Sequence, residues 1–233
     1  MQSFRQNVIS QIQRIEKGRI FTFQDLSYPV DKLANVGVIL SQQSKAGNLV
    51  RVERGAYYRP RTSTLGLGKL PVYQDEQFRY ITQKLDGYLS GPYIYNKLSL
   101  TEQSAATITI ATKNPVRPFR FKNLQVHCMK AYVDEINDEH TLLYLRLLDA
   151  LKDIKNIPGC TPFDVYERVK EQYISHFTKK ELEKVASLAK KYPPRVRKVL
   201  SDMLDDLNYP KLRDALTATI FPTTRFELNY KRA

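Results

Sequence analysis

The segment from Gly47 to Pro60, GNLVRVERGAYYRP, restricts the fold of this chain more than any other. Two short runs rich in β-branched and aromatic residues, LVRV and AYYRP, stand on either side of the turn ERG, and this pattern is typical of a β-hairpin. Gly55 supplies the positive backbone φ that such a tight turn often requires. We therefore predict a two-stranded ribbon over these residues, with Arg51, Arg54 and Arg59 on it.

Helical and turn patterns precede this ribbon. Apolar residues recur at helical spacing over residues 4–15, and Ser3 stands where a helix cap is expected. The run RIF then predicts a short strand. Thr22 and Asp25 have the spacing of a capping box, which predicts a short second helix that Pro29 stops.

A third helix is predicted over residues 31–47, with Asp31 as its cap. At about 100° per residue, Leu33, Val36 and Leu40 share one face of this helix. The opposite face carries four polar or small apolar residues: Asn35, Val38, Gln42 and Lys45.

Three helices followed by a two-stranded ribbon predict a winged helix-turn-helix over residues 1–62. In that arrangement the last helix enters the major groove of DNA and the ribbon lies along the backbone. Asparagine and glutamine pair with adenine and valine contacts the thymine methyl group, so the candidate base contacts are Asn35, Val38 and Gln42. The candidate phosphate contacts are Lys45, Arg51, Arg54 and Arg59.

The distribution of charge agrees with a polyanionic partner. The chain of 233 residues carries a formal net charge of +13. Residues 1–70 contain 11 Lys and Arg against 4 Asp and Glu, a balance of +7, whereas residues 134–233 contain 18 against 16, a balance of +2. The excess therefore belongs to the front of the molecule, where the hairpin lies.

The rest of the chain predicts a second domain over residues 71–233, after a linker near residues 60–71. A helix around YQDEQFRYITQKLD is followed by two alternating runs, ATITIAT and FRFKNLQVHCMKA, which predict strands within residues 88–131. Helices are predicted over about residues 137–220, with caps at Asn137, Thr161 and Thr178. The fold class is thus α+β: a winged helix-turn-helix, then a mixed sheet with a helical C-terminal region.

No pattern indicates catalysis or a bound cofactor. His127, His140 and His176 lie far apart in the sequence, and neither a phosphate-binding loop nor a nucleophile motif is present. We expect no enzyme activity, metal site or cofactor. No stretch approaches the roughly 20 apolar residues that span a bilayer, and the N-terminus lacks the apolar centre of a signal peptide, so a cytoplasmic protein without a membrane partner is expected.

The N-terminal pattern EKGRIFTFQDL, the third helix with Val36 and Leu40, and the segment GNLVRVERGAYYRP resemble the AbiEi-like antitoxin and transcriptional-regulator family of type IV toxin–antitoxin systems. The segment SGPYIYNKLSLTEQ, residues 90–103, is similar to a second family pattern. Its matching positions are Gly91, Asn96, Leu98, Leu100, Thr101 and Gln103. Together these segments cover about the first 130 residues.

This resemblance implies a transcriptional repressor whose winged helix binds repeats in its own promoter, as a monomer or a homodimer. It also implies a C-terminal part that counters a nucleotidyltransferase-like toxin without a stable complex. Three alternatives stay open: a protein-binding module, an RNA-binding module, and a nucleic-acid-processing enzyme whose carboxylates lie far apart in sequence. The basic run at residues 190–198 is either a second nucleic-acid contact or a solvated helix start.

Overall fold

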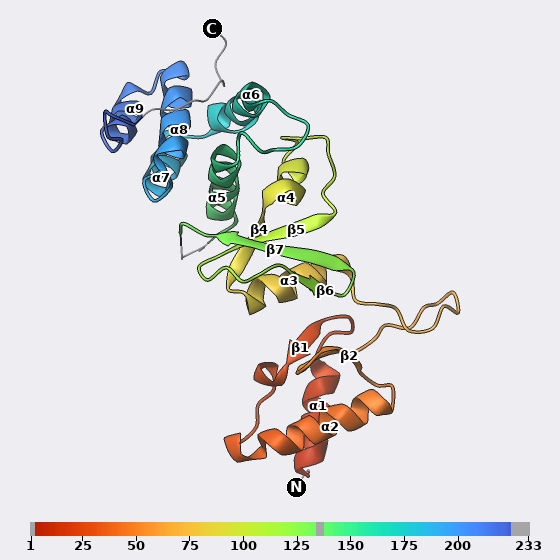
Figure 1. Ribbon diagram of the computed structural model, residues 1–233. Coiled ribbons are helices and arrows are strands. Elements are labelled where there is room, and N and C mark those ends of the chain that lie inside the picture. The colour runs from red at the N-terminus through yellow and green to blue at the C-terminus, as the bar shows by residue number, and fades with distance from the viewer. Residues whose placement is uncertain (1–2, 134–137, 225–233) are drawn as a thin grey trace. The chain divides into compact units, whose positions relative to one another are not determined.

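The computed structural model describes residues 3–133 and 138–224, and the chain divides into two compact units, Met1–Lys84 and Leu85–Ala233. The protein is mixed α/β with two sheets (Figure 1). The expected domain limits, 1–62 and 71–233, stay a prediction, because the division by contacts groups residues 63–84 with the first unit.

The first unit combines helices with a small antiparallel sheet of order β1-β3-β2. In chain order its helices, 3-10 turns (η) and strands are α1 (Phe4–Arg14), β1 (Ile20–Thr22), η1 (Phe23–Asp25), η2 (Val30–Lys32), α2 (Leu33–Lys45), β2 (Val50–Glu53), β3 (Ala56–Tyr58) and α3 (Gln74–Lys84). Figure 1 shows α1 and α2 on the same side of this sheet. The predicted hairpin over residues 47–60 is confirmed as β2 and β3.

The helix starts agree with the sequence in part. Ser3 caps α1 through a capping box with Gln6. Thr22 and Asp25 also form the expected capping box, and the short helix predicted after Thr22 is a single 3-10 turn, η1, that ends at Asp25. Asp31 does not cap α2, because it lies inside η2, which leads directly into that helix.

Side chains from α1, α2 and the sheet meet in the core of the first unit. The fully buried members include Val8, Ile12, Phe21, Val36, Ile39, Leu40, Leu49 and Tyr57. The predicted face of α2 is correct for Val36 and Leu40 and wrong for Leu33, which is 49% exposed. Ile39 takes its place in the core. The apolar face of α2 is therefore rotated toward Ile39.

α3 protects the free edge of the sheet. β1 is an edge strand, and its Ile20 N–H donates to Glu76 Oε1 at 2.6 Å while its carbonyl accepts from Arg79 Nη2 at 2.9 Å. Glu76 and Arg79 also bond to each other. Because these side chains occupy the backbone groups of Ile20, the edge cannot pair with another strand at this residue.

The second unit has a mixed sheet of order β4-β5-β7-β6, in which β5 and β7 are parallel and the other pairs are antiparallel. Its elements are β4 (Gly87–Ser90), α4 (Gly91–Lys97), β5 (Thr107–Thr112), β6 (Phe119–Phe121), β7 (Leu124–Lys130), α5 (Glu139–Lys152), α6 (Pro162–Gln172), η3 (Ile174–His176), α7 (Lys179–Ala189), α8 (Pro194–Asp206) and α9 (Pro210–Thr217). Figure 1 shows α4 and α5 against the sheet and α6–α9 beyond α5.

Most predicted features of this unit are confirmed. The sheet is mixed as expected, and Thr161 and Thr178 each form a capping box. The run FRFKNLQVHCMKA forms two strands instead of one, because the chain turns at Lys122, where φ is +54°. The predicted cap Asn137 lies outside the described residues, and Asp138 caps α5.

A carboxylate is fully buried in the core of the second unit. Asp149 on α5 accepts hydrogen bonds from Ser90 Oγ at 2.7 Å, the Tyr88 hydroxyl at 2.9 Å and the Tyr192 hydroxyl at 3.2 Å. Burial raises the pKa of Asp149 to about 6, although these hydrogen bonds act to lower it. The residue joins α5, β4 and the segment before α8 through three hydroxyl groups.

Because folding raises the pKa of Asp149, its contribution to stability is complete below its unfolded pKa and is lost as the pH rises through about 6. Between pH 4 and pH 7 the stability of the wild type relative to Asp149→Asn should fall by about 2 to 3 kcal/mol. Urea denaturation at both pH values measures this difference. Glu183→Gln, at an exposed position on α7, is the control, and an Asp149→Asn difference that does not change with pH would contradict the prediction.

Candidate nucleic-acid interface

The predicted base contacts are exposed on α2. Asn35, Val38 and Gln42 all reach the surface, as does Lys45 at the end of the helix. Because the buried face of α2 is rotated toward Ile39, however, these residues differ in how far they lie from that face. The residues farthest from the buried face are Ala34, Val38, Ser41 and Lys45, whereas Asn35 and Gln42 lie at its flank.

Ala34 and Ser41 were not among the contacts predicted from the sequence. Neither residue has a charged or amide side chain. Their places at the centre of the exposed face follow from the burial of Ile39, which is 5% exposed. Ile39 belongs to the apolar run Val38-Ile39-Leu40, and this run alone does not indicate which of the three residues is exposed.

Gln42 is already engaged by another side chain. Its Oε1 accepts a hydrogen bond from Arg5 Nη1 on α1 at 2.7 Å. A paired contact with adenine uses the carbonyl oxygen and the amino group of glutamine together. Oε1 has a second lone pair, so the bond from Arg5 orients Gln42 and leaves its amino group and one acceptor position for a base.

Arg51 and Arg54 lie on the β2–β3 hairpin. Arg54 and Gly55 form its two-residue turn, with φ at +81° for Gly55. Arg51 donates from Nε to the carbonyl of Glu53 at 3.2 Å, so its terminal nitrogens remain available for a ligand. Both arginines are exposed.

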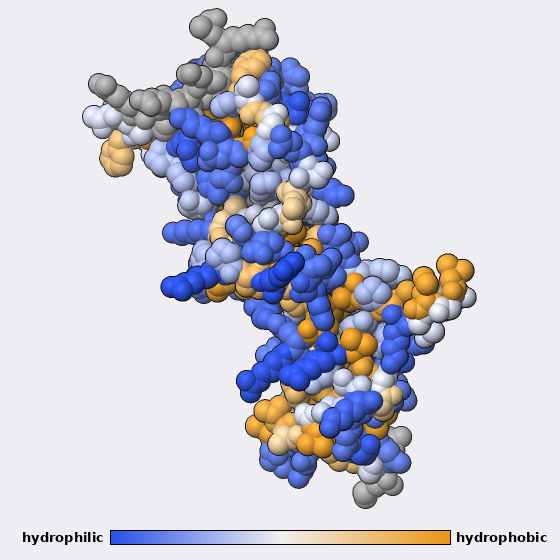
Figure 2. All heavy atoms as spheres, turned by 45° about the vertical axis from the view of Figure 1, so that its right-hand side comes forward, coloured by the Kyte–Doolittle hydropathy of each residue, from blue (hydrophilic) through white to orange (hydrophobic). Residues whose placement is uncertain are grey.

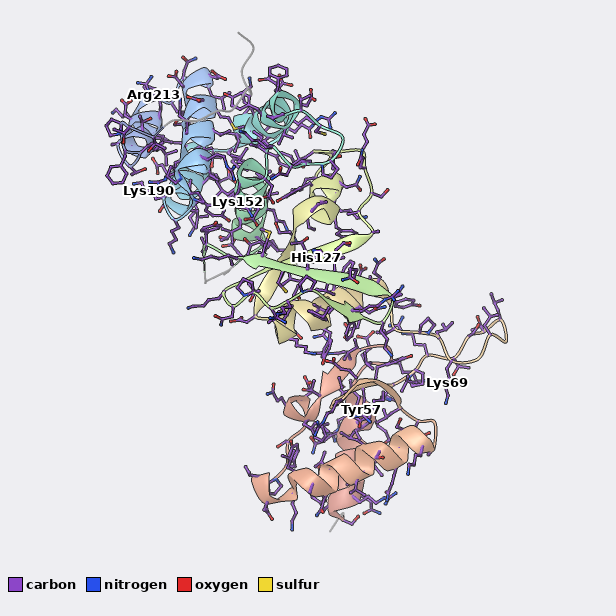
Figure 3. The ribbon with its side chains drawn as sticks, viewed as in Figure 1. Tyr57, Lys69, His127, Lys152, Lys190 and Arg213 are labelled. Carbon is purple, nitrogen blue, oxygen red and sulfur yellow. The ribbon has the colours of Figure 1, made fainter. Side chains whose placement is uncertain are left out.

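A groove of about 800 Å³ brings these two arginines together with the N-terminal half of α2. Its lining comes from η1, the segment after it, α2 and the hairpin: Phe23, Gln24, Tyr28, Leu33, Ala34, Gly37, Arg51, Arg54, Gly55 and Tyr57. This lining contains two cations and no acidic residue. Figure 3 labels Tyr57, which rises from β3 beside α2.

The acidic residue of the hairpin, Glu53, is paired with α3 within the first unit. Glu53 Oε1 accepts from the Tyr80 hydroxyl and from Lys84 Nζ, each at 2.5 Å. Burial acts to raise the pKa of Glu53, but the hydrogen bonds from Lys84 and Tyr80 outweigh it and lower the pKa below its ordinary value. Glu53 therefore stays ionised and paired with α3, and it does not compete for Arg51 and Arg54.

Arg59, the fourth predicted phosphate contact, lies elsewhere. Its Nη1 donates to the carbonyls of Gln13 at 2.5 Å and Ile15 at 2.7 Å, at the end of α1. It lines a separate groove of about 320 Å³ with Lys17 and Lys69. The structure thus brings Arg51 and Arg54 together and leaves Arg59 apart from them.

The residues of the second family pattern, in segment 90–103, support packing in the second unit. Gly91 has φ of +72°, and a side chain there would meet Thr109 at 2.7 Å. Asn96 Nδ2 donates to the carbonyl of Thr101 at 3.1 Å, and Thr101 Oγ1 donates to the carbonyl of Pro158 at 2.5 Å. These positions shape the turn that follows α4.

Within residues 3–133 and 138–224, no three His, Cys, Asp or Glu side chains gather so that they could hold a metal ion. Over the same residues, no helix combines the length and apolar character needed to cross a membrane. Cys128 and Cys160 are half-buried and unpaired in this part of the chain.

No protein-family model matches the chain, and no curated protein matches it. The crystal structure of the RV2827C protein from Mycobacterium tuberculosis is similar, with a TM-score of 0.41 and 15% sequence identity. The similarity covers 93% of this chain and 81% of that one. A likeness of this degree does not assign a function.

Arg59 should contribute to stability, and Arg54 should not. Arg59→Ala removes two charge-assisted hydrogen bonds at the end of α1 and should cost about 1 to 2 kcal/mol of unfolding free energy. Arg54→Ala, at the exposed turn, should cost less than about 0.5 kcal/mol. Urea denaturation of the full chain compares the two, and equal losses would show that the bonds of Arg59 to α1 do not stabilise the protein.

Proposed function

We propose that the first unit is a winged helix-turn-helix that binds duplex DNA, with α2 as the recognition helix and the β2–β3 hairpin as the wing. The observation that carries this proposal is the groove that Arg51 and Arg54 share with the exposed N-terminal half of α2. In such domains base contacts come from the N-terminal part of the recognition helix, and cations beside it hold phosphates.

The electrostatics of the first unit support the proposal. The side chains of Arg14, Lys17, Arg19, Lys45 and Arg54 have no hydrogen-bond or ion-pair partner among the described residues. These unpaired cations belong to the segment that has a net charge of +7. A surface of this kind binds a polyanion by releasing its counterions.

The wider role that we propose is repression of the protein's own operon and action as the antitoxin of a type IV toxin–antitoxin system. It rests on the resemblance of residues 47–60 and 90–103 to the AbiEi-like family. The second unit would then counter a nucleotidyltransferase-like toxin without forming a stable complex. A neighbouring reading frame that encodes such a toxin, and whose toxicity this protein relieves on co-expression, would support this role.

Replacement of Arg51 and Arg54 by alanine should weaken binding to every duplex tested. Each lost phosphate contact should lower the slope of log K against log salt by about 0.9, so the double variant should lose about 2. Fluorescence anisotropy at several salt concentrations, against DNA from just upstream of the gene, measures both effects.

The matched control for this experiment is Lys179→Ala with Lys180→Ala. Both lysines are exposed at the start of α7 in the second unit, outside the basic run at residues 190–198. This variant loses the same net charge. If both double variants weaken binding equally, the hairpin has no special part in DNA binding and the proposed wing is wrong.

A further inference from the structure

α2 is nearly free of charge although it lies in a strongly basic unit. Its sequence is LANVGVILSQQSK, and Lys45, the final residue, is its single charged residue. The nearby cations come from other elements, with Arg51 and Arg54 on the hairpin. The helix and the hairpin therefore offer different chemistry to a ligand.

The N-terminal half of α2 exposes apolar side chains together. Leu33 is 49% exposed and Val38 is 55% exposed, and Val30 in the preceding turn is 91% exposed. Ala34, between them, is exposed as well. Leu33 and Ala34 line the groove that holds Arg51 and Arg54. Single exposed apolar residues are common, but a group beside two arginines indicates contact with a partner that is both apolar and anionic.

The major groove of DNA presents one apolar group, the C5 methyl of thymine. Guanine is read most often by arginine or lysine, and cytosine by an acidic side chain. From Leu33 to Ser44, α2 has none of these residues. It does have exposed Asn35, which suits adenine.

We propose that this protein selects A·T base pairs, and that it does so by packing thymine methyl groups against Leu33, Ala34 and Val38. This inference rests on the proposed DNA binding. It adds the substrate class: duplex DNA rich in thymine where α2 enters the groove, with affinity supplied by Arg51 and Arg54 and selectivity supplied by the uncharged helix.

The first test changes the DNA and leaves the protein untouched. Sites are selected with the full chain from a random duplex library, and each thymine of the preferred site is then replaced by deoxyuridine, which lacks only the C5 methyl. Each contacted methyl should account for about a fourfold loss of affinity. We expect enrichment of A·T pairs and a loss at two or more thymine positions.

The second test assigns the contact to α2. Val38→Ala should weaken binding to the thymine site, and the loss caused by deoxyuridine at one position should shrink in this variant. Val116→Ala, at a valine 46% exposed in the second unit, is the matched control and should leave both values unchanged.

Four outcomes would overturn the inference. Enrichment of G·C pairs, or equal affinity for thymine and deoxyuridine sites, would reject thymine selection while DNA binding stands. An unchanged deoxyuridine loss in both Val38→Ala and a Leu33→Ala variant would remove the contact from α2. Absence of binding to any duplex at low salt would reject the proposed function itself.

Discussion

The attachment of β3 to the end of α1 fixes the geometry of the first unit. Arg59 follows β3 and bonds to the carbonyls of Gln13 and Ile15, while Arg61 Nε donates to the carbonyl of Lys17 at 2.9 Å. The Gly18 N–H in turn donates to the carbonyl of Arg59 at 2.8 Å. These bonds hold the hairpin strand against the first helix, and the groove between α2 and the hairpin depends on that hold.

Because of this attachment, some basic side chains of the first unit are already bonded within the protein. The guanidinium groups of Arg59 and Arg61 donate hydrogen bonds to backbone carbonyls. The guanidinium group of Arg79 bonds to Glu76 and to the carbonyl of Ile20. A count of charges treats all of them as available to a polyanion. The cations left for a ligand are fewer, and among them Arg51 and Arg54 lie on the hairpin beside α2. The loop between β3 and α3 carries two exposed leucines, Leu65 and Leu67. Its apolar tip projects at the right of Figure 2.

Local patterns in the sequence predicted local structure well, and long-range packing limited the rest. The hairpin and the caps at Ser3 and Thr161 depend on neighbouring residues, so they could be predicted. The phase of α2 could not, because burial of Ile39 depends on the core around α1. The same holds for the site: the exposure of Arg54 follows from a local turn, whereas the bonds of Arg59 join residues 44 and 46 positions apart.

The uncharged helix gives a reason for placing the cations on a separate element. Lysine or arginine between Leu33 and Ser44 of α2 would add affinity for every duplex and would also favour guanine. In the proposed complex, cations on the hairpin would meet phosphates, which are the same in every sequence. A recognition helix with apolar and amide side chains can then discriminate by methyl groups and adenine edges, at little cost to binding strength. Under the proposed function, the division of charge between Arg54 and the residues from Leu33 to Ser44 would separate affinity from selectivity within one small unit.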